Sequence, residues 1–306
     1  MTAQGVILVT GAGGGVGGVG RTVVELLREH DLPVRALLHR EDERADAVRA
    51  LGAEVIVGDL TRPDDVSRAL DGASRMFFSM TVSPDYLEAT AVVATVARAL
   101  GTLEALVSIS QMTVSQMHVT STEESHHQRL HWLAEQVLNW STLPVVHVRP
   151  TIFLDNPLLT LLAARSIAET GTIRLPFGTG RTSPIAAGDV AGVVAAILRE
   201  PGQHLGHTYE LTGPRVQDMH GVAEEFSRAL GRPVSYVDVS PQTWLEQTVE
   251  PAGLPAHVRD HLVTMARLHR EGRYDRSTRT VEEITGRPAQ TVQQFVEARR
   301  ALYSPA

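Results

Sequence analysis

Three side chains that could do acid–base chemistry recur at four-residue intervals in the middle of the chain. His127, His131 and Glu135 would share one face of a helix, because residues four apart are neighbours there. Imidazole titrates near neutral pH, so His131 could protonate or orient a carbonyl oxygen during a reduction, with His127 as a second candidate. Ser110, at the end of the preceding predicted strand, could donate a hydrogen bond to the same oxygen. Two histidines and Glu135 could instead hold zinc, or the face could be an ordinary polar surface.

Two residue types that would widen this chemistry are absent from the sequence. There is no cysteine, which excludes thiol catalysis, disulfides and thiolate metal ligands. There is no lysine, since all 28 residues counted as Lys+Arg are arginine. Schiff-base chemistry, a phosphate-loop lysine and a catalytic Tyr-x-x-x-Lys pair are therefore excluded. No further ligands stand at a recognisable zinc spacing, so we expect no metal site.

The elements that must position these side chains begin with a glycine-rich stretch. An apolar run at residues 6–9 leads into seven glycines within residues 11–20, and helical spacing follows at 22–27. In this strand–turn–helix context glycines indicate dinucleotide binding, because the backbone can approach a pyrophosphate at the helix N-terminus. Two registers fit, Gly11-x-x-Gly14-x-x-Gly17 and Gly14-x-x-Gly17-x-x-Gly20, and the sequence does not choose between them.

The next predicted strand, residues 33–38, ends in side chains that would select the nucleotide. NAD-binding folds usually carry an acid at this point to hold the ribose hydroxyls, whereas arginine accommodates a 2′-phosphate. Here His39 and Arg40 stand at the strand end, and the first acids come only at Glu41 and Asp42. We therefore expect NADP(H), with Arg40 on the adenine or the phosphate and His39 beside it. A simply solvated Arg40 would fit the same pattern.

Strands and helices alternate along the first 150 residues, which predicts a parallel, doubly wound α/β sheet of the Rossmann type. Asp59 and Leu60 follow the third strand and are expected near the adenine, while Ser79 and Met80 close the fourth strand near the nicotinamide ribose. After the first strand, the predicted strands are 33–38, 54–57, 75–80 and 104–110, and the predicted helices are 42–51, 63–70 and 84–100.

We expect two parts, a nucleotide-binding core at residues 1–150 and a small mixed α/β substrate lobe at residues 151–306. The lobe should cover the nicotinamide end, and parts of it should return to the core sheet. Its predicted helices are 156–170, 189–199, 218–230, 256–270 and 288–303, and its predicted strands are 172–175 and 234–239.

Net charge and hydropathy limit the classes of partner that the protein can bind. The net charge of −7 argues against nucleic acid, which needs a basic face. No apolar run approaches the roughly 20 residues of a membrane span. The first strand follows Met1 almost directly, without a basic leader segment, so a cytoplasmic location is expected. A homodimer is compatible with these properties.

Several short segments along the chain carry a family likeness. They are Val9-Thr10-Gly11-Ala12, Val34-Arg35-Ala36-Leu37, Gly58-Asp59-Leu60, His131-Trp132-Leu133-Ala134-Glu135, Leu143-Pro144, Val148-Arg149-Pro150, Phe153-Leu154-Asp155-Asn156 and residues 183–191. Together they resemble the NmrA-like branch of the atypical short-chain dehydrogenases, a likeness that runs from about residue 5 to 297. The resemblance implies NADP(H) binding and hydride transfer without the Tyr-x-x-x-Lys pair. Isoflavone-reductase-like relatives carry a catalytic lysine where this chain has His131, and NmrA-like relatives often have histidine there.

The resemblance leaves two functions open. One is an NADPH-dependent reductase that acts on a small-molecule quinone or (poly)aromatic ketone, and the other is a non-catalytic NADP(H)-binding redox sensor. Several apolar residues fall in loops expected to line an acceptor pocket, where methionine adapts to flat, bulky ligands, although plain core positions would look the same. These residues are Met80, Met112, Met117, Phe153, Leu154 and Phe177.

Overall fold

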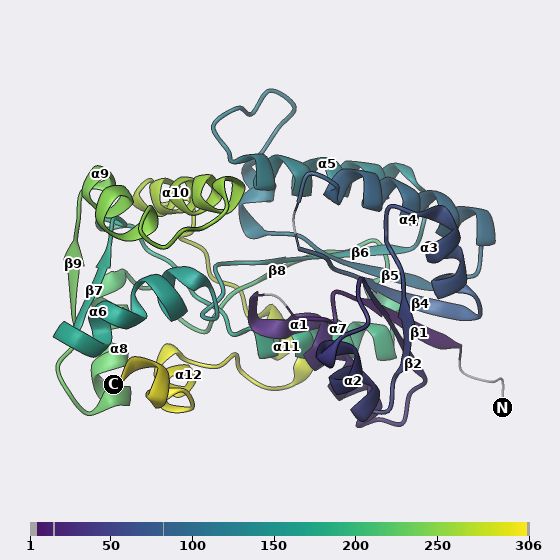
Figure 1. Ribbon diagram of the computed structural model, residues 1–306, viewed down its shortest axis with the longest axis horizontal. Helices are drawn as coiled ribbons and strands as arrows, with labels where there is room; N and C mark the ends of the chain where they lie inside the picture. Colours follow the sequence, from purple (N-terminus) through teal and green to yellow (C-terminus); the bar gives the residue numbers. More distant parts are fainter. Residues whose placement is uncertain (1–4, 15, 82, 305–306) are drawn as a thin grey trace.

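The computed structural model describes residues 5–14, 16–81 and 83–304, and a seven-stranded parallel sheet is its largest element (Figure 1). The strand order β3-β2-β1-β4-β5-β6-β8 confirms the predicted Rossmann-type α/β fold. In β1, Ile7, Leu8 and Val9 are at most 1% exposed, as expected of a parallel sheet covered on both faces. The strands are β1 (Val6–Thr10), β2 (Val34–Leu38), β3 (Glu54–Val57), β4 (Ala73–Phe78), β5 (Ala105–Ile109), β6 (Val145–Pro150) and β8 (Thr208–Leu211).

Helices cover the two faces of this sheet in separate layers (Figure 1). Each layer encloses its own apolar core against the strands, so both sheet faces are dry. One layer comprises α1 (Val19–Arg28), α2 (Glu43–Ala50), α7 (Ala187–Arg199) and α11 (Thr280–Thr285). The other comprises α3 (Pro63–Leu70), α4 (Tyr86–Leu100) and α5 (His126–Trp140).

A smaller lobe, at the left of Figure 1, lies beyond the carboxyl ends of the sheet strands. Two short parallel strands, β7 (Thr172–Leu175) and β9 (Ser235–Asp238), form a sheet of their own. The lobe has a separate apolar core that includes Phe226, Trp244 and Tyr303. Its helices are α6 (Ala164–Thr170), α8 (Met219–Leu230), α9 (Pro241–Trp244), α10 (Ala256–Arg270) and α12 (Val292–Glu297).

The strand order reverses between β1 and β4, which opens a crevice at their carboxyl ends. A single buried hydroxyl ties these two strand ends together. Thr10 Oγ1 donates a hydrogen bond to the carbonyl oxygen of Ser79 at 2.8 Å and accepts one from the Ser79 N–H at 2.9 Å. The loops that leave β1 and β4 therefore start from fixed points on the two sides of the crevice.

Most predicted elements lie within two residues of their expected bounds, but two helices differ. The predicted helix 156–170 is divided into a π-helical turn (Leu158–Leu162) and α6. In place of the predicted helix 288–303 the structure has α12 and a 3₁₀ turn (Arg300–Tyr303). The helix begins later than predicted because Thr291 caps it by accepting the Gln294 N–H at 3.1 Å. The sequence analysis did not identify β6, β8, α9 and α11.

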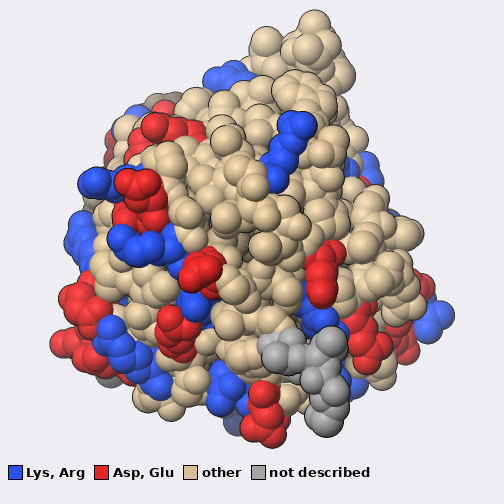
Figure 2. All heavy atoms as spheres, turned by 90° about the vertical axis from the view of Figure 1, so that its right-hand side faces the viewer, with Lys and Arg blue, Asp and Glu red and all other residues tan. Residues whose placement is uncertain are grey.

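The face at the right-hand end of Figure 1 carries mixed charge. Figure 2 shows arginines beside acidic residues on this face instead of one basic patch. At the amino ends of the strands, Arg35 pairs with Glu54 at 2.9 Å and Arg75 with Glu104 at 3.4 Å. Nucleic acid binding needs positive charge gathered on one face, which this surface does not offer. Among the described residues, no helix combines the length and the hydropathy that a bilayer-spanning segment needs.

The glycine turn packs directly against the start of α7. Gly17 has a φ of +68°, and a Cβ placed on it would lie 2.3 Å from the Ala187 Cβ and 3.2 Å from the Asp155 Cβ. The Asp155 carboxylate accepts the Ala187 N–H at 2.9 Å, which fixes these two neighbours relative to each other. Gly18 also has a positive φ, +61°, but a Cβ there would meet nothing within 4 Å.

This pair of glycines gives a matched stability test. Both Gly17→Ala and Gly18→Ala force alanine into the left-handed region, at roughly 1–2 kcal/mol each. Only Gly17→Ala also overpacks against α7, which typically adds about 1–3 kcal/mol. We expect a lower melting temperature for Gly17→Ala than for Gly18→Ala, measured by circular dichroism without nucleotide. Equal melting temperatures would show that the turn can shift away from α7 without loss of stability, so that the contact with α7 does not constrain it.

Candidate functional site

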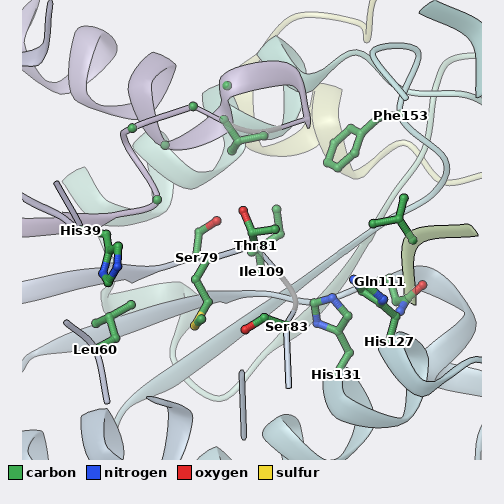
Figure 3. Close-up of a pocket in the computed structure, with 18 of the residues that line it drawn as sticks. His39, Leu60, Ser79, Thr81, Ser83, Ile109, Gln111, His127, His131 and Phe153 are labelled. Carbon is green, nitrogen blue, oxygen red and sulfur yellow. The ribbon is translucent and has the colours of Figure 1, made fainter. Parts of the chain in front are cut away.

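A cavity of about 810 Å³ lies between the carboxyl ends of the sheet strands and the small lobe. This volume falls within the roughly 300–1,000 Å³ of small-molecule and cofactor sites. His39 and Leu60 lie at one end, Ser79 lies in the middle, and Phe153 and His131 lie toward the other end (Figure 3). The glycine turn, the ends of five neighbouring strands, and residues of α5 and α10 line its walls.

The glycine turn forms one wall of the cavity. Gly11, Gly14 and Gly20 line it, together with Gly13 and Gly18. Gly14, with a φ of +101°, borders open space, since a Cβ there would meet nothing within 4 Å. Gly17 is not among the lining residues and instead packs on α7, so neither predicted register describes the cavity wall completely. Gly15 lies outside the described residues.

The amino end of α1 suits a pyrophosphate. Its cap residue, Gly18, offers no side-chain hydrogen bond, and the first turn contains no acidic residue. The unpaired N–H groups of a helix start and the positive end of its dipole favour an anion. A Cβ on Gly20 would lie 2.7 Å from the Gly11 carbonyl group, so only glycine lets the helix approach the turn this closely. These residues fit a dinucleotide.

At the adenosine end, His39 and Arg40 are exposed and line the cavity. The two acidic residues that follow them form ion pairs with other arginines. Glu41 accepts from Arg49 at 2.8 Å, and Asp42 accepts from Arg44 Nε at 3.0 Å, which holds the pKa of each carboxyl below its usual value. Across the described residues, Arg40 has no hydrogen bond or ion pair of its own. Its guanidinium is therefore available to an anionic ligand.

Asp59 and Leu60 line the same end, beside His39 (Figure 3). Asp59 Oδ1 accepts hydrogen bonds from the Thr61 N–H at 2.9 Å and the Thr61 hydroxyl at 2.8 Å. These bonds lower the pKa of Asp59. The carboxylate therefore shapes the loop after β3, and Leu60 supplies apolar surface for a flat ring. Ser79 and Met80 line the middle of the cavity at the end of β4, where Thr10 fixes the Ser79 backbone.

His131 lies at the acceptor end of the cavity, and its imidazole is uncharged at neutral pH. Burial, with a smaller effect from His127, lowers its pKa to about 4. Its Nδ1 is buried and has no hydrogen bond among the described residues, which leaves Nε2 as the nitrogen that can face the cavity. The ring packs edge-on against Tyr86, with centroids 4.9 Å apart. This environment favours the orienting hydrogen bond over proton transfer from an imidazolium.

Glu135 lies on the same helical face as the two histidines, but its carboxylate pairs with Arg149. It is 2% exposed, and both carboxylate oxygens accept from Arg149, one of them at 2.9 Å. Burial alone would raise the pKa of Glu135, and Arg149 more than reverses that effect. The zinc arrangement considered from the sequence is therefore not formed, and within the described ranges no three His, Asp or Glu side chains are placed to hold a metal.

Ser110 lines the cavity at the end of β5 and is 5% exposed. Its Oγ makes no hydrogen bond of normal geometry to a described residue, although it lies near enough to Glu135 to help lower the pKa of that carboxyl. Of the apolar residues predicted to line the pocket, Met80 and Phe153 do so. The others do not appear in its lining, and Met112, Leu154 and Phe177 are core residues.

The sequence analysis missed the contribution of α10. His261 lines the cavity, and its ring stacks on His127 at 4.7 Å. The ring of His257, one turn earlier on α10, also stacks on His127, with centroids 5.7 Å apart. Burial, with His127 and His131 nearby, lowers the pKa of His261 to about 3. The four-residue spacing of His257 and His261, which repeats that of His127 and His131, was the available signal. The remaining lining residues that were missed include Thr81, Ser83, Gln111, Val258, Leu262, Met265 and Tyr274.

These neutral histidines predict acid sensitivity. In the folded protein, His131 stays unprotonated down to about pH 4 and His261 down to about pH 3. In the unfolded chain both would take up protons near pH 6.5. The unfolded chain therefore binds more protons below pH 6.5, so the free energy of unfolding falls as the pH falls. Each histidine contributes up to about 1.4 kcal/mol per pH unit.

Urea unfolding between neutral pH and about pH 5 measures this slope. We expect His261→Gln to flatten it, and the exposed His118→Gln, as a control, to leave it unchanged. The same slope in wild type and His261→Gln would mean that His261 takes up protons equally in the folded and unfolded protein, so that burial does not lower its pKa.

Comparison with known proteins identifies the relatives of this fold. The model of the NmrA-like family matches residues 3–297. A protein named NAD(P)H azoreductase, from Xenophilus azovorans, is 31% identical over 295 residues, which cover 96% of this chain and 98% of that protein. The match therefore extends over both the nucleotide end and the small lobe.

Solved structures share the fold at lower identity. An NADPH-dependent quinone oxidoreductase from Escherichia coli, complexed with NADPH, superposes with a TM-score of 0.83 at 22% identity, over 96% of this chain and 99% of that one. NmrA, a negative transcriptional regulator in complex with NADP, has a TM-score of 0.79 at 19% identity, over 96% and 94% of the two chains. At these identities the likeness establishes the fold and leaves the function to be argued from the site.

Proposed function

The chain belongs to the NmrA-like family, and on that premise we propose that it is an NADPH-dependent oxidoreductase that reduces planar aromatic acceptors, namely quinones or aromatic ketones. The full-length relative named as an NAD(P)H azoreductase supports the reductase class. The proposal for this chain rests on its own cavity.

The extent of the cavity carries the proposal. It begins at Arg40, passes the glycine turn and Ser79, and continues to Phe153 and the α10 residue Met265. A nucleotide accounts for the part between the arginine and the strand ends. The part that continues under α10 offers apolar walls and a few polar groups, which is the composition of a small-molecule site. This extension gives room for a second small molecule beside the nucleotide, which a reductase requires.

The walls of this extension suit a flat, apolar molecule. Phe153 lies across the cavity from His131 (Figure 3), and Val258, Leu262 and Met265 of α10 add aliphatic surface. Methionine adapts its shape to bulky rings, and an aromatic side chain stacks on them. Ser110 and His131 are among the residues that offer polar atoms to the acceptor.

When bound, NADPH would supply a hydride to the acceptor. The free N–H groups at the start of α1 and the Arg40 guanidinium would hold the phosphates, and the walls around Ser79 would place the nicotinamide toward Phe153. His131 and Ser110 would orient the acceptor oxygen by hydrogen bonds. Because His131 is uncharged near neutral pH, we infer that water supplies the proton that completes the reduction.

Nucleotide choice is the first test of this assignment. With Glu41 and Asp42 already paired, Arg40 should favour NADPH over NADH through the 2′-phosphate. A charge-assisted contact of this kind is worth roughly 1.5–3 kcal/mol, or about 10- to 100-fold in affinity. We expect Arg40→Ala to lose most of that preference with little change for NADH, measured by fluorescence titration. Arg98→Ala, an exposed arginine on α4, serves as the control. Equal NADPH and NADH affinities in the wild type would contradict the assignment.

Turnover is the second test. NADPH oxidation should accelerate in the presence of quinones, aromatic ketones and azo compounds, followed by the loss of nicotinamide absorbance. With a ketone, His131→Ala should lower kcat at least about tenfold, because loss of one hydrogen-bond donor to a developing oxyanion typically costs about 10²–10³ in kcat, while NADPH affinity stays constant. Tight NADPH binding without turnover on any acceptor would instead support the sensor function.

A further inference from the structure

We propose that His261 of α10 is a second catalytic hydrogen-bond donor, which pairs with His131 of α5 to hold the acceptor oxygen from two sides. The inference deepens the proposed function and rests on it. It assigns a reaction-centre residue to the small lobe, about 130 positions along the chain from His131.

The hydrogen bonds around Ser125 fix the tautomer of His261. Ser125 caps α5, where its Oγ accepts the Gln128 N–H at 3.2 Å. The remaining partner of this hydroxyl among the described residues is His261 Nδ1, at 2.8 Å. Because the hydroxyl hydrogen has no other acceptor among the described residues, the arrangement that satisfies it donates this hydrogen to Nδ1, and we therefore assign the ring proton to Nε2.

The hydrogen-bond partners also indicate which ring nitrogen of His131 carries the proton. Its Nδ1 is buried among the described residues without a partner, and an orphaned buried N–H is rarer than an unfilled acceptor. The proton therefore resides on Nε2. Neither Nε2 atom has a hydrogen-bond partner in the described parts of the chain, and both side chains line the cavity. The geometry thus offers two N–H donors to a ligand.

Packing holds the two donors close to each other. His261 stacks on His127, which precedes His131 by one helical turn. His131 is near enough to help lower the pKa of His261. The α10 helix is also tied to the segment before α5, because the Arg267 guanidinium donates to the Glu123 carbonyl oxygen. The donors therefore need little reorganisation when charge develops, which is the condition for effective electrostatic stabilisation.

The pair would act on the charge that hydride transfer creates. Bound NADPH would supply the hydride: a C–H bond of its nicotinamide would break as a C–H bond formed at the carbonyl carbon, the C=O π electrons would move to the oxygen, and NADP⁺ would remain. The oxyanion then takes a proton from water, and both histidines remain neutral throughout. Hydrogen bonds to a charged oxygen are stronger than those to the starting carbonyl, so two N–H donors favour the transition state.

Paired variants test the role of the N–H group. His261→Leu removes the donor, whereas His261→Gln keeps an N–H near the position of Nε2. Loss of one such donor typically costs about 10²–10³ in kcat. With an aromatic ketone we expect His261→Leu to lower kcat at least about tenfold and His261→Gln to recover most of it, at unchanged NADPH affinity. His257→Leu, on the exposed side of α10, is the control. Wild-type kcat in folded His261→Leu would overturn the proposal.

A binding measurement separates this inference from the proposed function. The anion of 2-hydroxy-1,4-naphthoquinone presents a planar ring and an oxyanion, and its absorbance reports binding to the NADP⁺-saturated protein. We expect His261→Leu to weaken its binding at least about tenfold and His261→Gln to bind nearly as well as the wild type. Equal affinity in all three proteins would overturn the proposal. If the wild type reduces no acceptor, the reductase function fails, and this titration still decides whether the two histidines bind an oxyanion.

Discussion

The site depends on the contact that holds the carboxyl ends of β1 and β4 together. The Thr10 hydroxyl is fully buried and both donates to and accepts from the Ser79 backbone. The glycine turn leaves from one of these strands and the wall beside the nicotinamide position leaves from the other. The backbone ladder between the two strands ends at Val9 and Phe77, and the Thr10 side chain extends the connection to the point where the two loops leave. Losing the hydroxyl would leave buried backbone groups unpaired, which is costly in a dry interior.

Local patterns in the sequence predicted most elements of the nucleotide half of the molecule, although not β6. The apolar run of β1, the glycines and the arginine after β2 each act within a few residues of one another, so spacing alone predicted them. The role of His261 depends on contacts between segments far apart in the chain, which periodicity does not record. The helix predicted over residues 288–303 failed for a different reason. Its apolar spacing was helical, but the cap at Thr291 fixed a later start.

The two ends of the cavity differ in charge because they differ in exposure to solvent. Arg40 stays exposed and charged where a phosphate would sit, whereas His131 and His261 lose their charge to desolvation. The cavity thus has charged side chains, including Arg40 and Asp59, at one end and uncharged histidines at the other. An anionic group on the acceptor would meet no arginine at that second end, because Arg149 is already committed to Glu135.

The seating of Gly17 on Ala187 and Asp155 has a consequence for how this architecture can diversify. The nucleotide turn is encoded at the start of the chain, but its underside is formed by residues that flank the small lobe. The two halves are therefore not interchangeable modules. A chimera that took its second half from a relative would carry a foreign surface beneath its own phosphate turn. New acceptor specificities are more accessible through changes in α10, which contacts the cavity without supporting the turn.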